Sequence, residues 1–269
     1  SYAKVRFDER SIATLKAHLG KIDDSLTRAL CWSAAWDMLR DAEISATDFI
    51  DIALAGLPGE HDIATVTIIA NQLVTAVELY SAPLKRDSAR LKVGNAYEKM
   101  LNAAKPGSDH QLQFARNLTS FASSAEHNDL IKELFDGKLA GLKVDADLRW
   151  TFVIALAERG LMDQQALAAE LLKDNTLTGQ LSHATALAAL PTPEAKAQTW
   201  KSITTEEIST SQREAKIAGF MRALHRPLLA SYVDPYFDLC SFLVIKFLTN
   251  NSNSLEYTLH PFSLKLTRL

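Results

Sequence analysis

The sequence predicts an all-α protein, a right-handed α-solenoid built from antiparallel helix pairs of the HEAT or armadillo kind. Three observations support this class. Apolar residues recur with helical spacing over nearly the whole chain, and short polar turns separate these segments. Pairs of segments also recur roughly every 35–45 residues, the period typical of such repeats. Because no strict sequence repeat is present, a compact multi-helix bundle is the alternative.

The first ten residues follow another pattern. Residues 2–7 alternate apolar and polar side chains and include β-branched and aromatic members, which predicts a short strand. A single strand is not stable without a partner. We therefore interpret residues 1–10 as the end of a preceding β domain and begin the helical domain, residues 11–238, at residue 11.

The first predicted helix spans residues 24–41, with Leu26, Ala29 and Leu30 at the start of its apolar stripe and Asp24 or Ser25 as its cap. The next helix begins in a capping box formed by Ser45 and Asp48. The remaining helices are expected at residues 62–80, 83–101, 108–125, 128–138, 147–160, 163–174, 178–190, 193–203 and 211–224.

Composition excludes several classes of protein. Hydrophobic residues make up 47% and charged residues 23% of the chain, which indicates a globular core rather than disorder. A net charge of -3 does not favour nucleic acid as a partner. Cys31 and Cys240 form no disulfide framework, which favours a reducing compartment. The apolar stretch at residues 242–248 is too short to span a bilayer. We expect a cytoplasmic protein without membrane contact.

No catalytic or metal-binding motif is found. The sequence contains no HExxH, no pair of histidines at i, i+4, no GxSxG and no glycine-rich phosphate loop. We therefore predict no catalytic residue, no metal ligand and no cofactor in this chain, and we expect the seven histidines on the surface or in turns. The pairs at residues 60–61 and 126–127 are interpreted as caps or solvated turns.

Aromatic and basic clusters are interpreted conservatively. Trp32 and Trp36 lie one helical turn apart and are expected to pack in the core. The basic residues between positions 85 and 92 are expected to form a solvated helix face. That run comprises Lys85, Arg86, Arg90 and Lys92.

Two arginines are candidates for contact with a peptide substrate. Arg149 lies near the start of a long apolar helix, where its guanidinium could bind a carboxylate with two hydrogen bonds. The alternative is a salt bridge with Asp145 or Asp147. Arg222 is the second candidate, in a cationic cluster with His225 and Arg226.

A series of motifs resembles the C-terminal region of bacterial aminopeptidase N, in particular the actinobacterial type. The resemblance covers residues 2–238, and beyond residue 239 the sequence departs from the helical ending expected there, so residues 239–269 are treated as an atypical segment. The motifs are VRFDERS at 5–11, DDSLTRALCW at 23–32, AWDMLRD at 35–41, DLRW at 147–150, DNTLTG at 174–179, PEAK at 193–196 with Trp200, and QREAKIAGF at 212–220.

The resemblance implies a zinc aminopeptidase whose catalytic domain lies upstream in the same polypeptide and whose C-terminal helical domain covers the active site and limits access. It also implies that a small β-sandwich follows the catalytic domain, and residues 1–10 would then be the end of this β-sandwich domain. Zinc would then belong to the parent enzyme and not to this chain. The implied partners are the upstream catalytic domain and peptide substrates. The alternative function is a free-standing α-solenoid scaffold that binds partner proteins along its groove.

Overall fold

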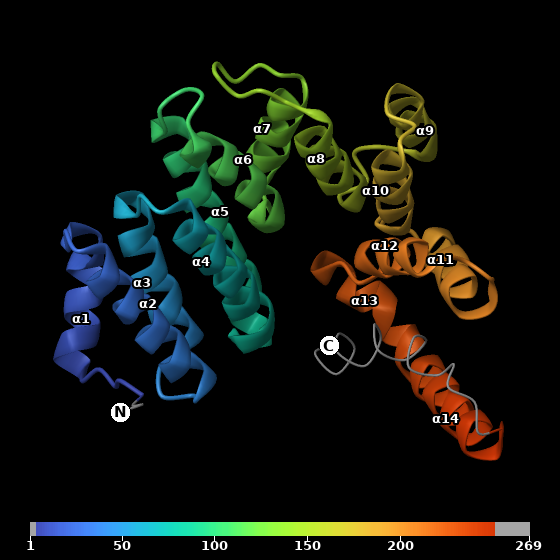
Figure 1. Ribbon diagram of the computed structural model, residues 1–269, viewed down its shortest axis with the longest axis horizontal. Coiled ribbons are helices and arrows are strands. Elements are labelled where there is room, and N and C mark those ends of the chain that lie inside the picture. Colours follow the sequence, from blue (N-terminus) through green and yellow to red (C-terminus); the bar gives the residue numbers. More distant parts are fainter. Residues whose placement is uncertain (1–3, 251–269) are drawn as a thin grey trace. The chain divides into compact units, whose positions relative to one another are not determined.

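The computed structural model describes residues 4–250, with side-chain environments described as far as residue 242. Two compact units divide the chain, unit 1 over residues 1–144 and unit 2 over residues 145–269. Between residues 4 and 250 the regular structure is helical throughout, and no strand occurs in that range (Figure 1). The all-α prediction is confirmed for this part of the chain.

The helices of unit 1 are α1 Glu9–His18, α2 Ser25–Arg40, α3 Ala46–Gly56, α4 Ile63–Thr75, α5 Pro83–Ala103, α6 Asp109–Phe121 and α7 Ala125–Phe135. A single π-helical turn, Ala76–Tyr80, continues α4. The helices of unit 2 are α8 Ala146–Glu158, α9 Gln164–Lys173, α10 Leu177–Ala188, α11 Pro193–Thr205, α12 Thr210–Phe220, α13 Arg226–Leu229 and α14 Val233–Asn250. Short 3₁₀ turns lie at Leu19–Lys21, Leu57–Gly59, Ala223–His225 and Ala230–Tyr232.

Local capping determines where most helices begin. An Asp, Ser or Thr side chain accepts a backbone N–H at the start of α1 to α4 and of α6 to α12. Asp24 caps α2 in this way, and Ser45 forms the predicted capping box with Asp48 at α3. α5 begins instead at Pro83, whose missing N–H costs nothing in the first turn.

Unit 1 packs its helices in two rows. α1, α3, α5 and α7 contact one another in that order, and α2, α4 and α6 form a second such series. This alternation is the packing expected of helix pairs within a repeat array, while a solenoid over the whole chain stays a prediction. Aromatic pairs fill the core, with ring centroids 5.5 Å apart for Tyr97 and Phe121 and 5.3 Å apart for Trp36 and Phe49. Trp32 is buried as expected, whereas Trp36 is half-buried and packs against Phe49.

Unit 2 is organised around α10, which contacts α8, α9, α11 and α12. Three aromatic rings form one side of its core, with centroids 6.0 Å apart for Trp200 and Phe220 and 5.3 Å apart for Trp200 and Tyr232. Ile203, Ile217 and Tyr236 form a smaller buried cluster beside them.

The structure differs from the sequence-based expectations at both ends. α1 was not predicted, and it begins where Asp8 accepts the backbone N–H of Ser11 at 2.7 Å. Residues 4–8 are irregular, so the predicted strand at residues 2–7, which lies partly outside the described residues, is not confirmed. α14 continues through the expected boundary at residue 239. The domain assignment itself stays a prediction.

Several side chains lie on the opposite side of their helix from the expected one. Leu26, Ala29 and Leu30 are exposed on α2, whereas Arg28 is buried because it pairs with Glu60 across the unit. Arg90 is likewise buried, which corrects the expectation of a wholly solvated basic face. An apolar stripe therefore identifies a helix more reliably than it identifies which face packs.

One segment of the described chain, Ile63–Tyr80, has the length and mean hydropathy of a membrane-spanning helix. Its residues Val66, Ile69 and Leu73 are fully buried in unit 1. A core helix satisfies the same criteria, so length and composition carry little weight here.

Candidate functional site

The described part of the chain contains no group of three or more His, Cys, Asp or Glu side chains placed to hold a metal ion. Two of the seven histidines nevertheless lie in the interior, contrary to expectation. His127 is fully buried and its Nδ1 accepts the backbone N–H of Ser123 at 3.3 Å. His225 is buried too, and its Nε2 donates to the carbonyl oxygen of Glu158 at 2.8 Å. Both imidazoles are thus structural.

Of the two roles expected for Glu60, a cap or a solvated turn, burial of its side chain excludes the solvated turn. Its carboxylate accepts two hydrogen bonds from the Arg28 guanidinium, each at 3.0 Å, and one from each of the backbone N–H groups of His61 and Asp62 at 2.9 and 3.0 Å. Burial raises the pKa of Glu60, and these hydrogen bonds more than offset that effect, so its pKa lies below the ordinary value. The pair fixes the start of α4 against α2.

Arg149 lies in the first turn of α8 and binds a carboxylate of the next helix. Its Nε and Nη2 donate to the two oxygens of Glu170 at 2.6 and 2.9 Å. Glu170 also accepts from Lys173 at 2.6 Å, and these hydrogen bonds, that of Arg149 first, lower its pKa. Asp145, one expected partner, instead caps α8. The Arg149 side chain stays 32% exposed.

The neighbouring Trp150 stabilises the same region, where α8 meets α9. Its indole Nε1 donates to Asp174 Oδ2 at 2.9 Å, which joins α8 to the turn between α9 and α10. Hydrogen bonds from Thr176 and then from Trp150 lower the pKa of Asp174. The backbone that carries Arg149 is therefore held in place by hydrogen bonds on both sides of the α8–α9 contact.

Arg222 binds a second carboxylate at the other end of α8. Its Nη2 lies 2.5 Å from Oε2 of Glu158, and Nη1 of Arg159 lies 3.7 Å from the same oxygen. Glu158 is only 6% exposed. Burial raises its pKa, and the attraction of Arg222 more than offsets this, so the carboxyl group is ionised at neutral pH.

Lys196 lies beside this cluster without contact with solvent. Its Nζ donates to the carbonyl oxygen of Ala188 at 2.6 Å and to those of Gly219 and Phe220 at 3.4 Å. These carbonyls end α10 and α12, where the helix dipoles concentrate negative charge. Burial lowers the pKa of Lys196 to about 8 even though Glu158 attracts its positive charge.

The predicted cationic cluster at Arg222 therefore has a different composition. Burial, followed by the charge of Lys196, lowers the pKa of His225, so the imidazole is neutral and adds no charge. The structure also keeps the two candidate arginines on separate carboxylates. Arg149 and Glu158 are nine residues apart on α8, which corresponds to about 13 Å along the helix axis.

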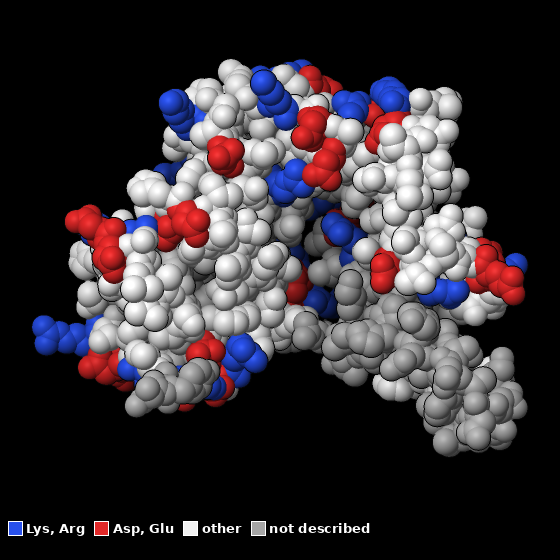
Figure 2. All heavy atoms as spheres, viewed as in Figure 1, with Lys and Arg blue, Asp and Glu red and all other residues white. Residues whose placement is uncertain are grey.

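Of the buried charged residues near the two arginines, one could have been predicted from the sequence. Lys196 falls on the same helical stripe as Thr199 and Ile203, both buried, so its position predicts an interior lysine. Glu158 and Glu170 give no such signal, because their partners are distant in sequence. Elsewhere on the surface, Figure 2 shows positive and negative side chains interspersed on the viewed face, without a field of one sign.

Comparison with known proteins gives two matches. The family described as "ERAP1-like C-terminal domain" matches residues 1–259. Over 241 residues the chain is 43% identical to Aminopeptidase N from Streptomyces lividans, and this stretch covers 88% of the chain and 28% of that relative. The chain thus spans little more than a quarter of the relative's length. The resemblance found from the motifs is confirmed.

Proposed function

Because this chain belongs to the family of ERAP1-like C-terminal domains, we propose that it is the C-terminal domain of a longer zinc aminopeptidase, in which it covers the active site and limits which peptides enter. The observation that carries the proposal is the 43% identity to an aminopeptidase of which the chain spans only 28%. The hydrolytic chemistry then resides in the part of the polypeptide that precedes this domain.

Zinc does not fit this chain itself, since the described residues offer no group of ligands for it. A structural or catalytic zinc site needs three or four ligands from His, Cys, Asp or Glu. In this proposal the metal belongs to the parent enzyme, and this domain binds and orients peptides and excludes those that do not fit. A cytoplasmic location is part of the same proposal.

Arg149 and Arg222 are the residues we propose to face the peptide. Each guanidinium is oriented by a buried carboxylate, Glu170 or Glu158, and each arginine side chain remains about a third exposed, at 32% and 29%. An arginine held in this way presents its guanidinium in a fixed direction, which favours hydrogen bonds to a carboxylate or carbonyl of a long peptide. Short substrates would not reach them.

The first experiment compares the longer polypeptide with and without this domain. We expect removal of residues 1–269 to raise kcat/KM for ten-residue peptides relative to that for an aminoacyl-amide reporter, because the barrier to long substrates is gone. Addition of the isolated chain in trans should restore the original ratio. An unchanged ratio would refute the covering role. Zinc-dependent reporter hydrolysis by the isolated chain would refute the assignment of chemistry to the preceding part.

The second experiment tests the arginines in the longer polypeptide. Arg149→Gln and Arg222→Gln should each raise KM for ten-residue peptides several-fold and leave reporter hydrolysis unchanged. Lys173→Gln is the matched control, since Lys173 pairs with the same Glu170 and is mostly exposed. An equal effect of the control would show that loss of the ion pair, not of a peptide contact, is responsible.

The scaffold alternative is separated from this proposal by the coding sequence that precedes Ser1. An HExxH motif with a distal glutamate in that region supports the aminopeptidase. An initiator methionine codon shortly before Ser1, without such a region, would favour the scaffold.

A further inference from the structure

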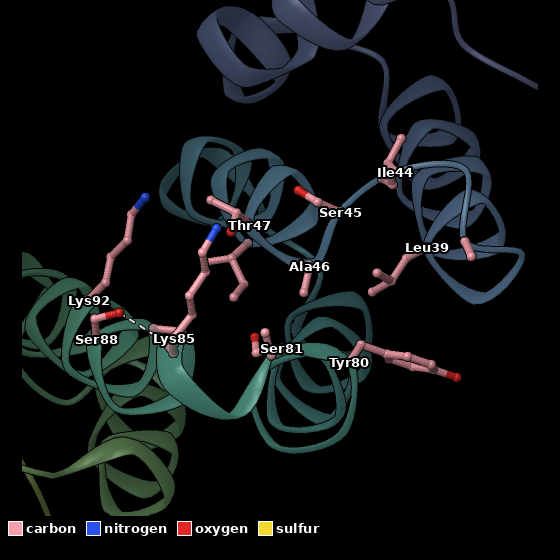
Figure 3. Close-up of a pocket in the computed structure, with 14 residues that line it drawn as sticks. Leu39, Ile44, Ser45, Ala46, Thr47, Tyr80, Ser81, Lys85, Ser88 and Lys92 are labelled. Carbon is pink, nitrogen blue, oxygen red and sulfur yellow. Dashed lines mark hydrogen bonds between the residues drawn. The ribbon is translucent and has the colours of Figure 1, made fainter.

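Unit 1 contains an open groove of about 620 Å³ beside the turn between α2 and α3. Its walls are mostly apolar and come from α2, α3, the π-helical turn and α5 (Figure 3). Leu39, Ile44 and Ile50 form one side, and Tyr80 and Ala89 contribute to the other. The groove is large enough for one or two side chains of a bound polypeptide.

Two irregular pieces of backbone form the rim of this groove. Ala42 adopts a left-handed conformation with φ of 60°, which is uncommon for a residue other than glycine. The π-helical turn ends at Tyr80, whose ring lies 6.1 Å from that of Trp36. Glu78 within the turn is buried and pairs with Arg90 at 2.7 Å. Irregular backbone held in place by buried contacts is a frequent feature of binding sites.

The charge on the groove comes from two lysines of α5. Figure 3 shows Lys85 and Lys92 extending in the same direction from that helix, toward Thr47. Lys92 pairs with Asp51. Within residues 4–242, no carboxylate lies within ion-pair distance of the Lys85 ammonium group. The groove is thus apolar at its base and has an available positive charge at its edge.

The chain enters unit 1 at the same rim. Lys4 Nζ lies 2.8 Å from Asp41 Oδ2, and Arg6 pairs with both Asp41 and Glu43. The backbone N–H of Phe7 lies 3.3 Å from the sulfur of Met38. These contacts hold residues 4–7 along the α2–α3 turn, next to Ala42 and Ile44. Lys4, the first described residue, therefore lies close to the groove, because its partner Asp41 adjoins the lining residue Ala42.

We propose that this groove is the docking site for the part of the longer polypeptide that precedes residue 1, which inserts an apolar side chain between Leu39 and Tyr80 and places a carboxylate on Lys85. This inference rests on the proposed function, since it requires that the longer polypeptide has a part that precedes this domain. The occupant follows from the tethered entry of the chain, the apolar base and the available lysine. Docking here fixes the preceding part through a contact in addition to the covalent link.

Cysteine labelling tests the proposal. Ser88→Cys lines the groove, and Asp129→Cys is the matched control on α7, where Asp129 is exposed. In the isolated chain both thiols should react with a maleimide at similar rates. In the longer polypeptide we expect Ser88→Cys to react at least tenfold more slowly and Asp129→Cys to be unchanged. Equal rates at Ser88→Cys in the two proteins, or equal slowing at both positions, would overturn the proposal.

A charge reversal provides the second readout. Lys85→Glu should lower the Tm of the longer polypeptide and leave that of the isolated chain unchanged. Lys99→Glu, an exposed position further along α5, is the control and should change neither. Slowing of Ser88→Cys labelling with concentration in the isolated chain would identify a second copy as the occupant, and would overturn the proposal.

Reporter hydrolysis is measured on the same preparations, so the two proposals fail separately. An active longer enzyme without protection at residue 88 rejects the docking site and leaves the proposed function in place. Protection in a longer polypeptide that hydrolyses no aminoacyl reporter supports the docking site and rejects the function.

Discussion

Lys196 makes the stability of unit 2 depend on pH in an unusual direction. Its ammonium group is excluded from water and has a pKa of about 8, against 10.5 for an exposed lysine. The perturbation that isolates this effect is Lys196→Met, which is one atom shorter than lysine, keeps most of the side-chain volume and removes the titrating group. The informative quantity is the free energy of unfolding of the natural chain minus that of the variant, measured across pH.

The sign follows from proton binding. Between pH 8 and 10.5 the unfolded chain keeps the Lys196 proton while the folded chain has lost it, so the free energy of unfolding rises with pH. Each tenfold change in proton affinity corresponds to about 1.4 kcal/mol, so the rise amounts to about 3 kcal/mol over this window. Below pH 8 the difference between the two proteins should be constant as far as this group is concerned. Titrations elsewhere in the chain cancel in the subtraction.

The assay is urea-induced unfolding followed by ¹⁹F NMR of protein labelled with 5-fluorotryptophan. Trp200 lies on the same helix as Lys196, so its resonance reports unit 2 separately from Trp32 and Trp36 in unit 1. A difference that stays flat from pH 7 to 10.5, or that falls, would refute the reasoning, since it would mean that the buried amine titrates as it does in the unfolded chain.

Three further predictions concern unit 1. Gly94→Ala should destabilise unit 1 by about 1–3 kcal/mol in urea unfolding, because the added Cβ would lie 2.6 Å from Cε1 of His127. On an exposed helix face the same change stabilises by about 1 kcal/mol. A variant that is more stable than the natural chain would contradict this packing. Arg28→Met should cost about 3–5 kcal/mol by stranding the buried Glu60, and adding Glu60→Gln should recover part of the loss, whereas a strictly additive pair would argue against the ion pair. Hydrogen bonds from Thr27 lower the pKa of the Asp24 cap below 3.8. The contribution of this cap to the free energy of unfolding is therefore complete above pH 3.8 and is lost as the pH falls through the lower pKa of the folded chain. Circular dichroism should show that Asp24→Asn loses less helix in acid than the natural chain does, and an identical acid transition would exclude this role.

Local chemistry could be predicted from sequence, and long-range pairing could not. Asp24 and the Ser45–Asp48 box were predicted correctly because a cap and its helix are contiguous. The exposed Leu26 and the buried Arg28 were assigned to the wrong faces, since the partner that buries Arg28 is Glu60, 32 residues away. Helical periodicity predicts which residues share one face of a helix, but it does not predict which other residues pack on that face.

The candidate site shows the same division. Arg149 forms an ion pair, which agrees with the alternative interpretation of that residue, but its partner Glu170 comes from another helix and was not foreseen. Whether Arg149 and Arg222 contact a peptide stays a prediction. The interior position of Lys196 had a sequence signal in its helical stripe. The three carbonyl oxygens that accept its hydrogen bonds could not be predicted, because they lie at the ends of α10 and α12.

The π-helical turn at Ala76–Tyr80 has a consequence for insertions and deletions. The backbone N–H of Ser81 donates to the carbonyl oxygen of Ala76 at 2.8 Å, five residues earlier, so this turn holds one residue more than an α-helical turn. Removing one residue would restore the α-helical phase and rotate everything after it by about 100° around the helix axis. Tyr80 would then swing away from Trp36. A one-residue deletion in this turn acts as a rotation and not as a shortening.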